Sequence, residues 1–120
     1  MKPYSLSTRV ASFGFAIQGI RQFFREEPNA WIHLIATIGV FITGYLTRVS
    51  WREAAILVLV TGMVWVAEVF NTAIENIVDL ISPDWHRSAG LIKDLSAAAV
   101  LLAALTALIT GAIIFIPKIF

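Results

Sequence analysis

Three apolar segments, each long enough to cross a membrane as a helix, constrain the fold of this chain more than any other feature of its sequence. They cover about residues 29–47, 53–81 and 94–116. A helix needs about 20 residues to cross a hydrocarbon core of about 30 Å, and lipid would leave the backbone groups of open strands without hydrogen-bond partners. The mean hydropathy of +0.81 agrees with membrane residence. We therefore predict an all-α membrane protein with three transmembrane helices.

A different pattern precedes the first of these segments. Apolar side chains recur there at helical spacing, at Val10, Phe13, Ile17, Ile20 and Phe24. Polar side chains occupy another side of the same helix, at Gln18, Gln22 and Arg25. This pattern predicts an N-terminal amphipathic surface helix over residues 8–25. Glu27 then precedes Pro28, which suits a first helical position, so a bend is expected between the two helices. The chain of 120 residues is expected to form a single domain.

The charged residues indicate an orientation and exclude one class of partner. Nine Lys and Arg balance eight Asp and Glu, so no basic surface for nucleic acid is expected. Six basic residues lie on one predicted side of the membrane: Lys2, Arg9, Arg21, Arg25, Arg87 and Lys93. The other three lie on the opposite side: Arg48, Arg52 and Lys118. Because cytoplasmic loops carry the excess of Lys and Arg, we predict a cytoplasmic N-terminus and a cytoplasmic loop from Ser82 to Asp94.

The second long segment carries an unusual row of polar side chains. The row consists of Glu68, Asn71, Thr72, Glu75 and Asp79. At about 100° per residue, these side chains fall within about 60° of one line on a helix. A carboxylate deep in the membrane costs at least about 2.5 kcal/mol and normally faces the bundle interior. Three interpretations remain open: a polar seam that fixes helix register, an ion or proton path, and a phosphoryl-transfer site.

The phosphoryl-transfer interpretation uses the depth of these side chains. Glu75 and Asp79 lie near the predicted cytoplasmic end, where Mg²⁺ bridging nucleotide phosphates would find oxygen ligands. Glu68 lies about 10 Å deeper along the helix axis, where a general base could reach a lipid hydroxyl. Lys93 begins the third span and can neutralise phosphate charge, or can simply extend to water. The chain contains no G-x-x-x-x-G-K-[ST] loop and no kinase glycine loop, so membrane helices would have to build the nucleotide site.

Three further features of the sequence bear on the site. Glu27, together with Asn29, could bind a metal ion, although a Glu before proline is also a common helix-start residue. His33 is expected to be a packed or hydrogen-bonded histidine. Small residues recur on the third span, at Ala99, Ala103, Ala107 and Gly111, and allow close helix packing within the chain or between subunits. Because three helices are too few to enclose both nucleotide and lipid, we expect an oligomer with sites at subunit boundaries.

Two motifs give the chain a resemblance to a known family. They are E-V-F-N-T-A-I-E-N-I-V-D, residues 68–79, and K-D-L-S-A-A-A-V-L, residues 93–101. Together they resemble the signature of the prokaryotic diacylglycerol kinase family, which includes undecaprenol kinases, and the likeness extends over about residues 8–117. The resemblance implies an ATP- and Mg²⁺-dependent lipid kinase of the bacterial cytoplasmic membrane, with a homotrimer whose subunits share active sites. Diacylglycerol giving phosphatidate is the leading expected reaction. Undecaprenol giving undecaprenyl phosphate is the alternative, and a non-enzymatic ion-conducting or structural membrane oligomer is the competing class.

The resemblance also implies roles for individual residues. Glu68 matches the catalytic base, with Asn71 and Lys93 beside it in the catalytic group, and Glu27 and Glu75 match the metal-binding carboxylates. The implied nucleotide contacts are Phe15, Glu27, Glu75, Asp79, Asp84, Trp85, His86, Lys93 and Asp94. Phe15 stands where the family commonly has a tyrosine near the nucleotide. The stretch E-P-N-A-W-I-H, residues 27–33, is similar to the E-x-N-x-x-I-H stretch of the undecaprenol kinase branch.

Overall fold

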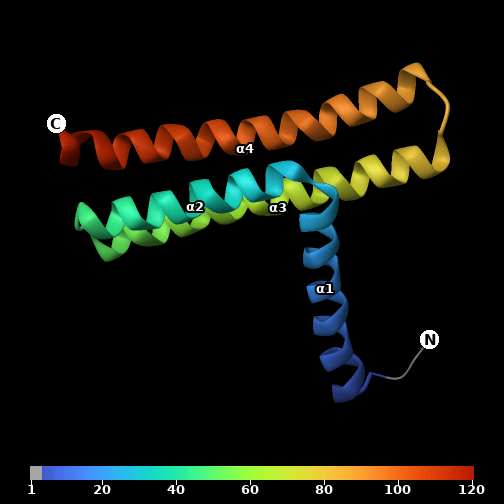
Figure 1. Ribbon diagram of the computed structural model, residues 1–120, viewed down its shortest axis with the longest axis horizontal. Helices are drawn as coiled ribbons and strands as arrows, with labels where there is room; N and C mark the ends of the chain where they lie inside the picture. Colours follow the sequence, from blue (N-terminus) through green and yellow to red (C-terminus); the bar gives the residue numbers. More distant parts are fainter. Residues whose placement is uncertain (1–3) are drawn as a thin grey trace.

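The computed structural model describes residues 4–120 as four α-helices in succession. They are α1 (Leu6–Glu26), α2 (Pro28–Leu46), α3 (Trp51–Ile81) and α4 (Arg87–Ile119). The last three are long and apolar enough to cross a membrane, so the predicted all-α class and the three candidate spans are confirmed. These three run alongside one another, while α1 leaves them to one side (Figure 1). Lys2, which contributes to the charge count, lies outside the described residues.

The ends of the helices follow local sequence signals. Ser50 caps α3: its hydroxyl accepts the Glu53 amide hydrogen, and the Glu53 carboxylate accepts the Ser50 amide hydrogen. Between α1 and α2 there is a single non-helical residue, Glu27, with Pro28 at the first position of α2. Because proline lacks an amide hydrogen, it is tolerated at that position and fixes the start of the helix. The bend expected before Pro28 is therefore present.

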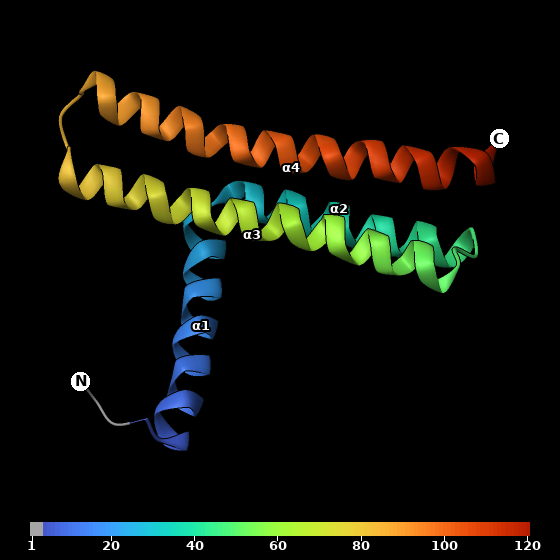
Figure 2. The same cartoon turned by 180° about the vertical axis from the view of Figure 1, so that it is seen from behind.

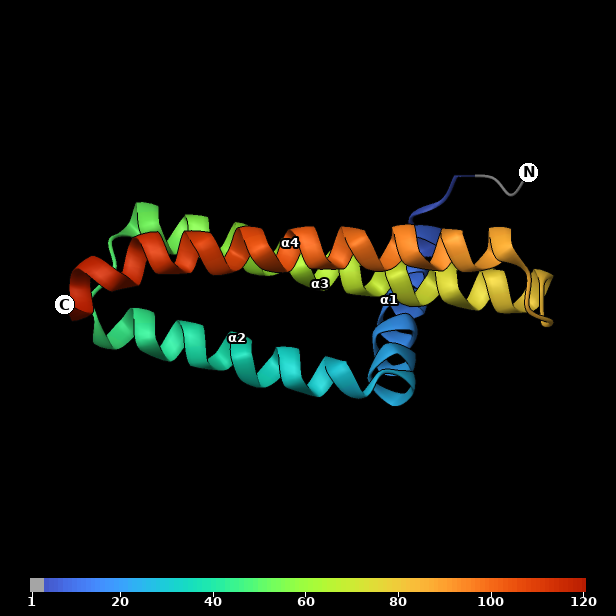
Figure 3. The same cartoon turned by 90° about the horizontal axis from the view of Figure 1, so that it is seen from above.

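The three long helices pack unevenly. α3 and α4 lie side by side along most of their length, as the front and back views agree (Figures 1 and 2). α2 stands farther from α4 when the molecule is seen from above (Figure 3). A groove of about 470 Å³ lies between α2 and α4 and is lined mainly by apolar side chains, together with His33 of α2 and Trp65 of α3. Most large apolar side chains of these helices are exposed in the single chain, as expected for surfaces that meet lipid or other subunits.

The fourth helix differs from the prediction at both ends. It begins at Arg87 and not at residue 94, and it continues to Ile119 and not to residue 116. His86 caps its first turn by accepting the Ser88 amide hydrogen, and the single Gly90 inside a helix costs only about 1 kcal/mol, too little to prevent helix formation. Pro117 does not end the helix, because a proline removes only one hydrogen bond and the amide of Phe120 still donates to the carbonyl of Ile116.

The earlier start of α4 shortens the connection between α3 and α4. The predicted loop from Ser82 to Asp94 is wrong, because the segment outside the helices covers only residues 82–86. Lys93 and Asp94 therefore lie about two turns inside α4 rather than at its beginning. The other three helices agree with the predicted ranges to within two residues at each end.

Candidate active site

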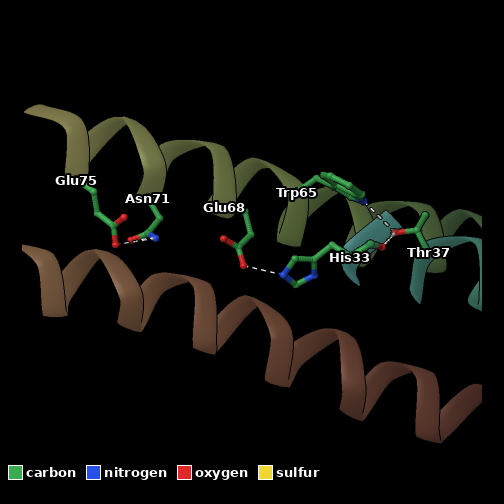
Figure 4. Close-up of polar contacts among 6 residues, drawn as sticks. All are labelled: His33, Thr37, Trp65, Glu68, Asn71 and Glu75. Carbon is green, nitrogen blue, oxygen red and sulfur yellow. Dashed lines mark hydrogen bonds and ion pairs between the residues drawn. The ribbon is translucent and has the colours of Figure 1, made fainter. Parts of the chain in front are cut away.

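The polar residues of α3 form a row that changes from buried to exposed along the helix. Glu68 and Thr72 are buried, with relative exposures of 7% each, Asn71 and Glu75 are partly exposed, and Asp79 is exposed. Glu68, Asn71 and Glu75 project from the same side of α3 (Figure 4). The row therefore leads from the packed middle of the bundle to the end of α3 that meets the short connection to α4.

The deepest carboxylate of the row is hydrogen-bonded to a histidine of the neighbouring helix. Glu68 Oε1 lies 2.7 Å from His33 Nε2, and the two side chains are 9% and 26% exposed (Figure 4). The expectation of a hydrogen-bonded His33 was therefore correct, but its partner was not predicted. Both residues lie in candidate membrane-spanning helices, and ionisable side chains there normally pair with one another across helices. That rule is the signal that could have identified the pair.

The middle of the row contains a polar atom without a partner. Asn71 Nδ2 lies 3.4 Å from Glu75 Oε1, a long hydrogen bond. Asn71 Oδ1 is buried and accepts no hydrogen bond from any residue that the structure describes, and the same holds for the hydroxyls of Thr72 and of Ser96 on α4. A buried acceptor without a donor is rare, so Asn71 Oδ1 is free to interact with a bound group or a partner subunit.

The exposed end of the row is joined to α4 by an ion pair. Lys93 Nζ lies 2.5 Å from Asp79 Oδ1, with side-chain exposures of 39% and 64%. The early start of α4 allows this contact, because it places Lys93 beside the last turn of α3. Asp94, next to Lys93, is exposed and forms no ion pair within residues 4–120. A cation and an acid thus stand together at the accessible end of the row.

The acidic residues at the α1–α2 bend are only partly connected to the row. Glu26 is hydrogen-bonded to α3: its carboxylate accepts a hydrogen bond from Asn76 of α3 at 3.1 Å and another from Gln22 of α1 at 2.6 Å. These hydrogen bonds, first that of Gln22 and then that of Asn76, lower the pKa of Glu26 below its ordinary value. Glu27 is half-buried at the bend. Glu26 and Asn76, which are the chain neighbours of Glu27 and Glu75, are therefore in contact. Glu26 was not among the site residues predicted from the sequence.

The remaining candidate residues lie away from Glu68 within one chain. Asp84, Trp85 and His86 form the exposed connection at the far end of the α3–α4 pair, and Trp85 is 88% exposed (Figure 1). Phe15 is exposed near the middle of α1, on a face that also carries Arg21 and Arg25. One chain thus does not bring all the predicted nucleotide contacts together.

Comparison with known proteins identifies the family. The sequence profile described as "Prokaryotic diacylglycerol kinase" matches residues 14–115. The chain is 40% identical over 108 residues to the "Undecaprenol kinase" of Bacillus subtilis, covering 90% of this chain and 88% of that protein. It is 33% identical over 111 residues to a "Diacylglycerol kinase" of Synechocystis sp., covering 92% of this chain and 63% of that protein. It is 30% identical over 105 residues to the "Diacylglycerol kinase" of Escherichia coli, covering 88% of this chain and 86% of that protein. The chain belongs to the prokaryotic diacylglycerol kinase family.

Membership of the prokaryotic diacylglycerol kinase family favours the lipid-kinase class over the non-enzymatic alternative for this chain. The named relatives are lipid kinases, so the resemblance found in the motifs is confirmed, and the family is one of membrane lipid kinases that use ATP as co-substrate. A non-enzymatic polar seam or ion path is not favoured. The exposed apolar faces of α2, α3 and α4 agree with membrane association.

A magnesium ion, which family resemblance implies, would require oxygen ligands near the nucleotide. The described residues contain no cluster of three or more His, Cys, Asp or Glu side chains that could enclose a metal ion. Mg²⁺ in nucleotide sites is commonly held by one or two carboxylates together with phosphate oxygens and water. Glu75 fits that requirement, because it is partly exposed and, within the part of the chain that the structure describes, is hydrogen-bonded only to Asn71, over a long distance. The half-buried carboxylate of Glu27 is the second candidate. The chemistry of these donors therefore suits a site completed by the nucleotide.

Proposed function

We propose that this protein transfers the γ-phosphoryl group of ATP to the hydroxyl of a membrane lipid, with Glu68 as the general base. In this reaction the lipid oxygen forms a bond to the γ-phosphorus as the bond from that phosphorus to the bridging oxygen of ADP breaks. The hydroxyl proton passes to the Glu68 carboxylate, and ADP leaves. The observation that carries the proposal is the row on α3, in which a buried carboxylate lies below an accessible ion pair of Asp79 and Lys93.

The same proposal gives the accessible residues their roles. Lys93 neutralises the negative charge that spreads over the transferred phosphoryl group, an electrostatic contribution that is large in phosphoryl transfer. Glu27 and Glu75 hold Mg²⁺, and Asn71 orients the reacting groups between Glu75 and Glu68. The proposed nucleotide contacts, which rest on family resemblance, are Phe15, Asp79, Asp84, Trp85, His86 and Asp94.

The acceptor is proposed to be a long-chain membrane alcohol, with undecaprenol favoured. The relative named for undecaprenol shares 40% identity, against 33% and 30% for two relatives named for diacylglycerol. His33, which contacts Glu68, also belongs to the E-P-N-A-W-I-H stretch that resembles the undecaprenol kinase branch. Diacylglycerol remains the second candidate, because the family profile and several relatives carry its name.

The proposed working form is a homotrimer in the bacterial cytoplasmic membrane, with α1 in the interface and the N-terminus in the cytoplasm. The distance between the connection at residues 82–86 and α1 supports sites that are shared between subunits, since one chain leaves the candidate nucleotide contacts apart (Figure 1). The excess of Lys and Arg at the end of the bundle that carries Lys93 supports the orientation. The whole chain of 120 residues is proposed to act as one domain.

The test is transfer of labelled phosphate from Mg-ATP to lipid by the full-length protein in detergent. Undecaprenol and diacylglycerol are supplied in separate reactions, for the wild type, Glu68→Gln and the control Glu53→Gln. Removal of a general base typically lowers the rate by about 100- to 10,000-fold, so Glu68→Gln should lose at least about 100-fold in kcat. Glu53→Gln should retain activity, because Glu53 lies at the opposite end of α3 in a pair with Lys118.

Two outcomes would contradict parts of the proposal. If the folded wild type labels neither lipid in the presence of magnesium, the proposed kinase activity is wrong for these acceptors. If Glu68→Gln is as active as Glu53→Gln, the activity stands but Glu68 is not the base. Preferential labelling of diacylglycerol would reverse the order of the two acceptors.

A further inference from the structure

A histidine outside the acidic row makes the closest side-chain contact of the proposed base. His33 belongs to α2, and its Nε2 lies 2.7 Å from Oε1 of Glu68 on α3 (Figure 4). The other oxygen of that carboxylate, Oε2, accepts no hydrogen bond from the described residues. The pair is thus asymmetric, with one oxygen held by the protein and the other available.

We propose that His33 is the positioning residue of the lipid-phosphorylation reaction. Its Nε2–H donates a hydrogen bond to Glu68 Oε1, which fixes the carboxylate so that Oε2 faces the acceptor hydroxyl. The lipid proton then passes to Oε2, while His33 keeps its own proton and does not touch the lipid. This inference rests on the proposed function, because it assigns His33 a task in that reaction only.

The surroundings of His33 hold its side chain in place. The His33 and Trp65 rings meet edge to face, with centroids 6.2 Å apart. Trp65 Nε1 donates to Thr37 Oγ1 at 2.9 Å, and that hydroxyl donates to the His33 carbonyl at 2.7 Å. These contacts link α2 to α3 beside the imidazole, on the side away from Glu68 (Figure 4). A side chain held in this way can keep a neighbouring carboxylate within the narrow geometry that catalysis requires.

The place of the pair in the fold gives the acceptor a route to it. The apolar groove of about 470 Å³ between α2 and α4 is lined at one end by His33 and Trp65 and farther along by Val40, Ala107 and Leu108. A hydrocarbon chain in this groove would bring its polar end toward the Glu68–His33 pair. Since His33 forms part of the groove and Glu68 is only 9% exposed, His33 also determines how closely the hydroxyl approaches the base.

The kinetic test compares His33→Ala, which removes the donor, with His33→Gln, which keeps an N–H group. Initial rates are measured with the full-length protein at varied lipid and ATP, each variant also in a Glu68→Gln background. Loss of a residue that orients a metal ligand typically costs about 10- to 100-fold in activity. We expect a similar effect for a residue that orients a base, so His33→Ala should lower kcat by about that factor and leave the KM for ATP within about twofold. His33→Gln should recover most of the loss. Thr43→Val is the control, because its hydroxyl bonds only to the Gly39 carbonyl in the same helix.

The double variant separates positioning from general structural damage. In the Glu68→Gln background, His33→Ala should cause no further loss of kcat, because the carboxylate that it positions is gone. A full additional loss in that background would overturn the inference. A kcat of His33→Ala equal to that of the wild type would also overturn the inference. The comparison of the wild type with Glu68→Gln would then still support the kinase activity and the role of Glu68. If the wild type itself forms no lipid phosphate, the proposed function fails and the inference fails with it.

A spectroscopic test does not depend on folding of the His33 variants. The chain has only two histidines, His33 and His86, so ¹⁵N-histidine labelling gives a spectrum with an internal control. Glu68→Gln should shift the Nε2 resonance of His33 and leave that of His86 unchanged, because His86 bonds to the Ser88 amide. Identical His33 resonances in the two proteins would overturn the inference.

Discussion

Replacing Lys93 by methionine should abolish most of the kinase activity while changing stability little. Lys93 Nζ lies 2.5 Å from Asp79 Oδ1, and the two side chains are 39% and 64% exposed. Two interpretations of this contact differ in what the substitution does. If Lys93 serves only the ion pair, its loss affects folding alone. If Lys93 also neutralises phosphate charge, its loss raises the barrier of the reaction.

The exposure of the pair sets the expected magnitudes. Ion pairs as exposed as this one contribute little to the free energy of unfolding, because water and salt screen the two charges. Removing one group that stabilises charge in a transition state typically costs about 100- to 1,000-fold in kcat, or about 2.7–4 kcal/mol. The catalytic effect should therefore exceed the structural effect several times over, and the two can be measured separately.

The assay pairs kinetics with unfolding, and the chain supplies a matched control. Lys118 Nζ lies 3.1 Å from Glu53 Oε2 at the opposite end of the α3–α4 pair, with exposures of 26% and 32%. Lys93→Met and Lys118→Met should lose similar free energies of unfolding in detergent, and only Lys93→Met should lose kcat. Lys93→Arg, which keeps the charge, should retain much of the activity. The reasoning is refuted if Lys93→Met keeps kcat within about threefold of Lys118→Met, a difference of less than 1 kcal/mol in barrier height.

Two further predictions concern the contacts of α1 and the buried hydroxyls. The hydrogen bonds of Gln22 and then of Asn76 lower the pKa of Glu26 from an ordinary value of 4.5. The part of this stabilisation that Asn76 supplies joins α1 to α3; it is complete above that value and is lost as the pH falls through the lowered pKa. Spin labels on single cysteines introduced into α1 and α3 should report wider separations below that range, and Asn76→Ala should show the wider separations already at neutral pH; unchanged separations would contradict the role of this contact. Thr72→Val removes a buried hydroxyl that has no hydrogen-bond partner among residues 4–120, so thermal unfolding in detergent should show unchanged or greater stability, by up to about 1 kcal/mol. A clear loss of stability would show that the hydroxyl has a partner, for example in a neighbouring subunit.

The features that the sequence predicts well are those that depend on neighbouring residues in the chain. Length and hydropathy alone predict the three spans, and Pro28 predicts the bend after Glu27, because each signal acts within a few residues. The helical period likewise predicts that Glu68, Asn71 and Glu75 share a side of α3, as Figure 4 shows. The start of α4 was missed because the polar residues after Arg87 and the glycine at position 90 resemble a loop, whereas the capping side chain of His86 decides the boundary.

The contacts between helices could not be predicted from one sequence. The Glu68–His33 hydrogen bond depends on the axial register of α2 against α3, which no local pattern specifies. The Glu26–Asn76 hydrogen bond likewise depends on the direction in which α1 leaves the bend. Such contacts are set by tertiary packing. The arrangement of subunits depends in addition on contacts between chains, which a single sequence specifies even less directly.

The length of α3 relates the site to the thickness of the membrane. Its 31 residues extend for about 46 Å, about 16 Å more than a typical hydrocarbon core. Trp51, at its first position, is a side chain that favours the membrane–water boundary, and Glu68 follows it by 17 residues, or about 26 Å. With Trp51 at one boundary, the proposed base Glu68 would lie just inside the opposite boundary, near the depth of lipid hydroxyls, and Glu75 would extend among the headgroups. A bilayer several ångströms thicker would submerge the carboxylates, and a thinner one would lift Glu68 above the acceptor. We therefore expect the rate of the enzyme to depend on bilayer thickness and to be greatest where the thickness of the hydrocarbon core matches the interval from Trp51 to Glu68.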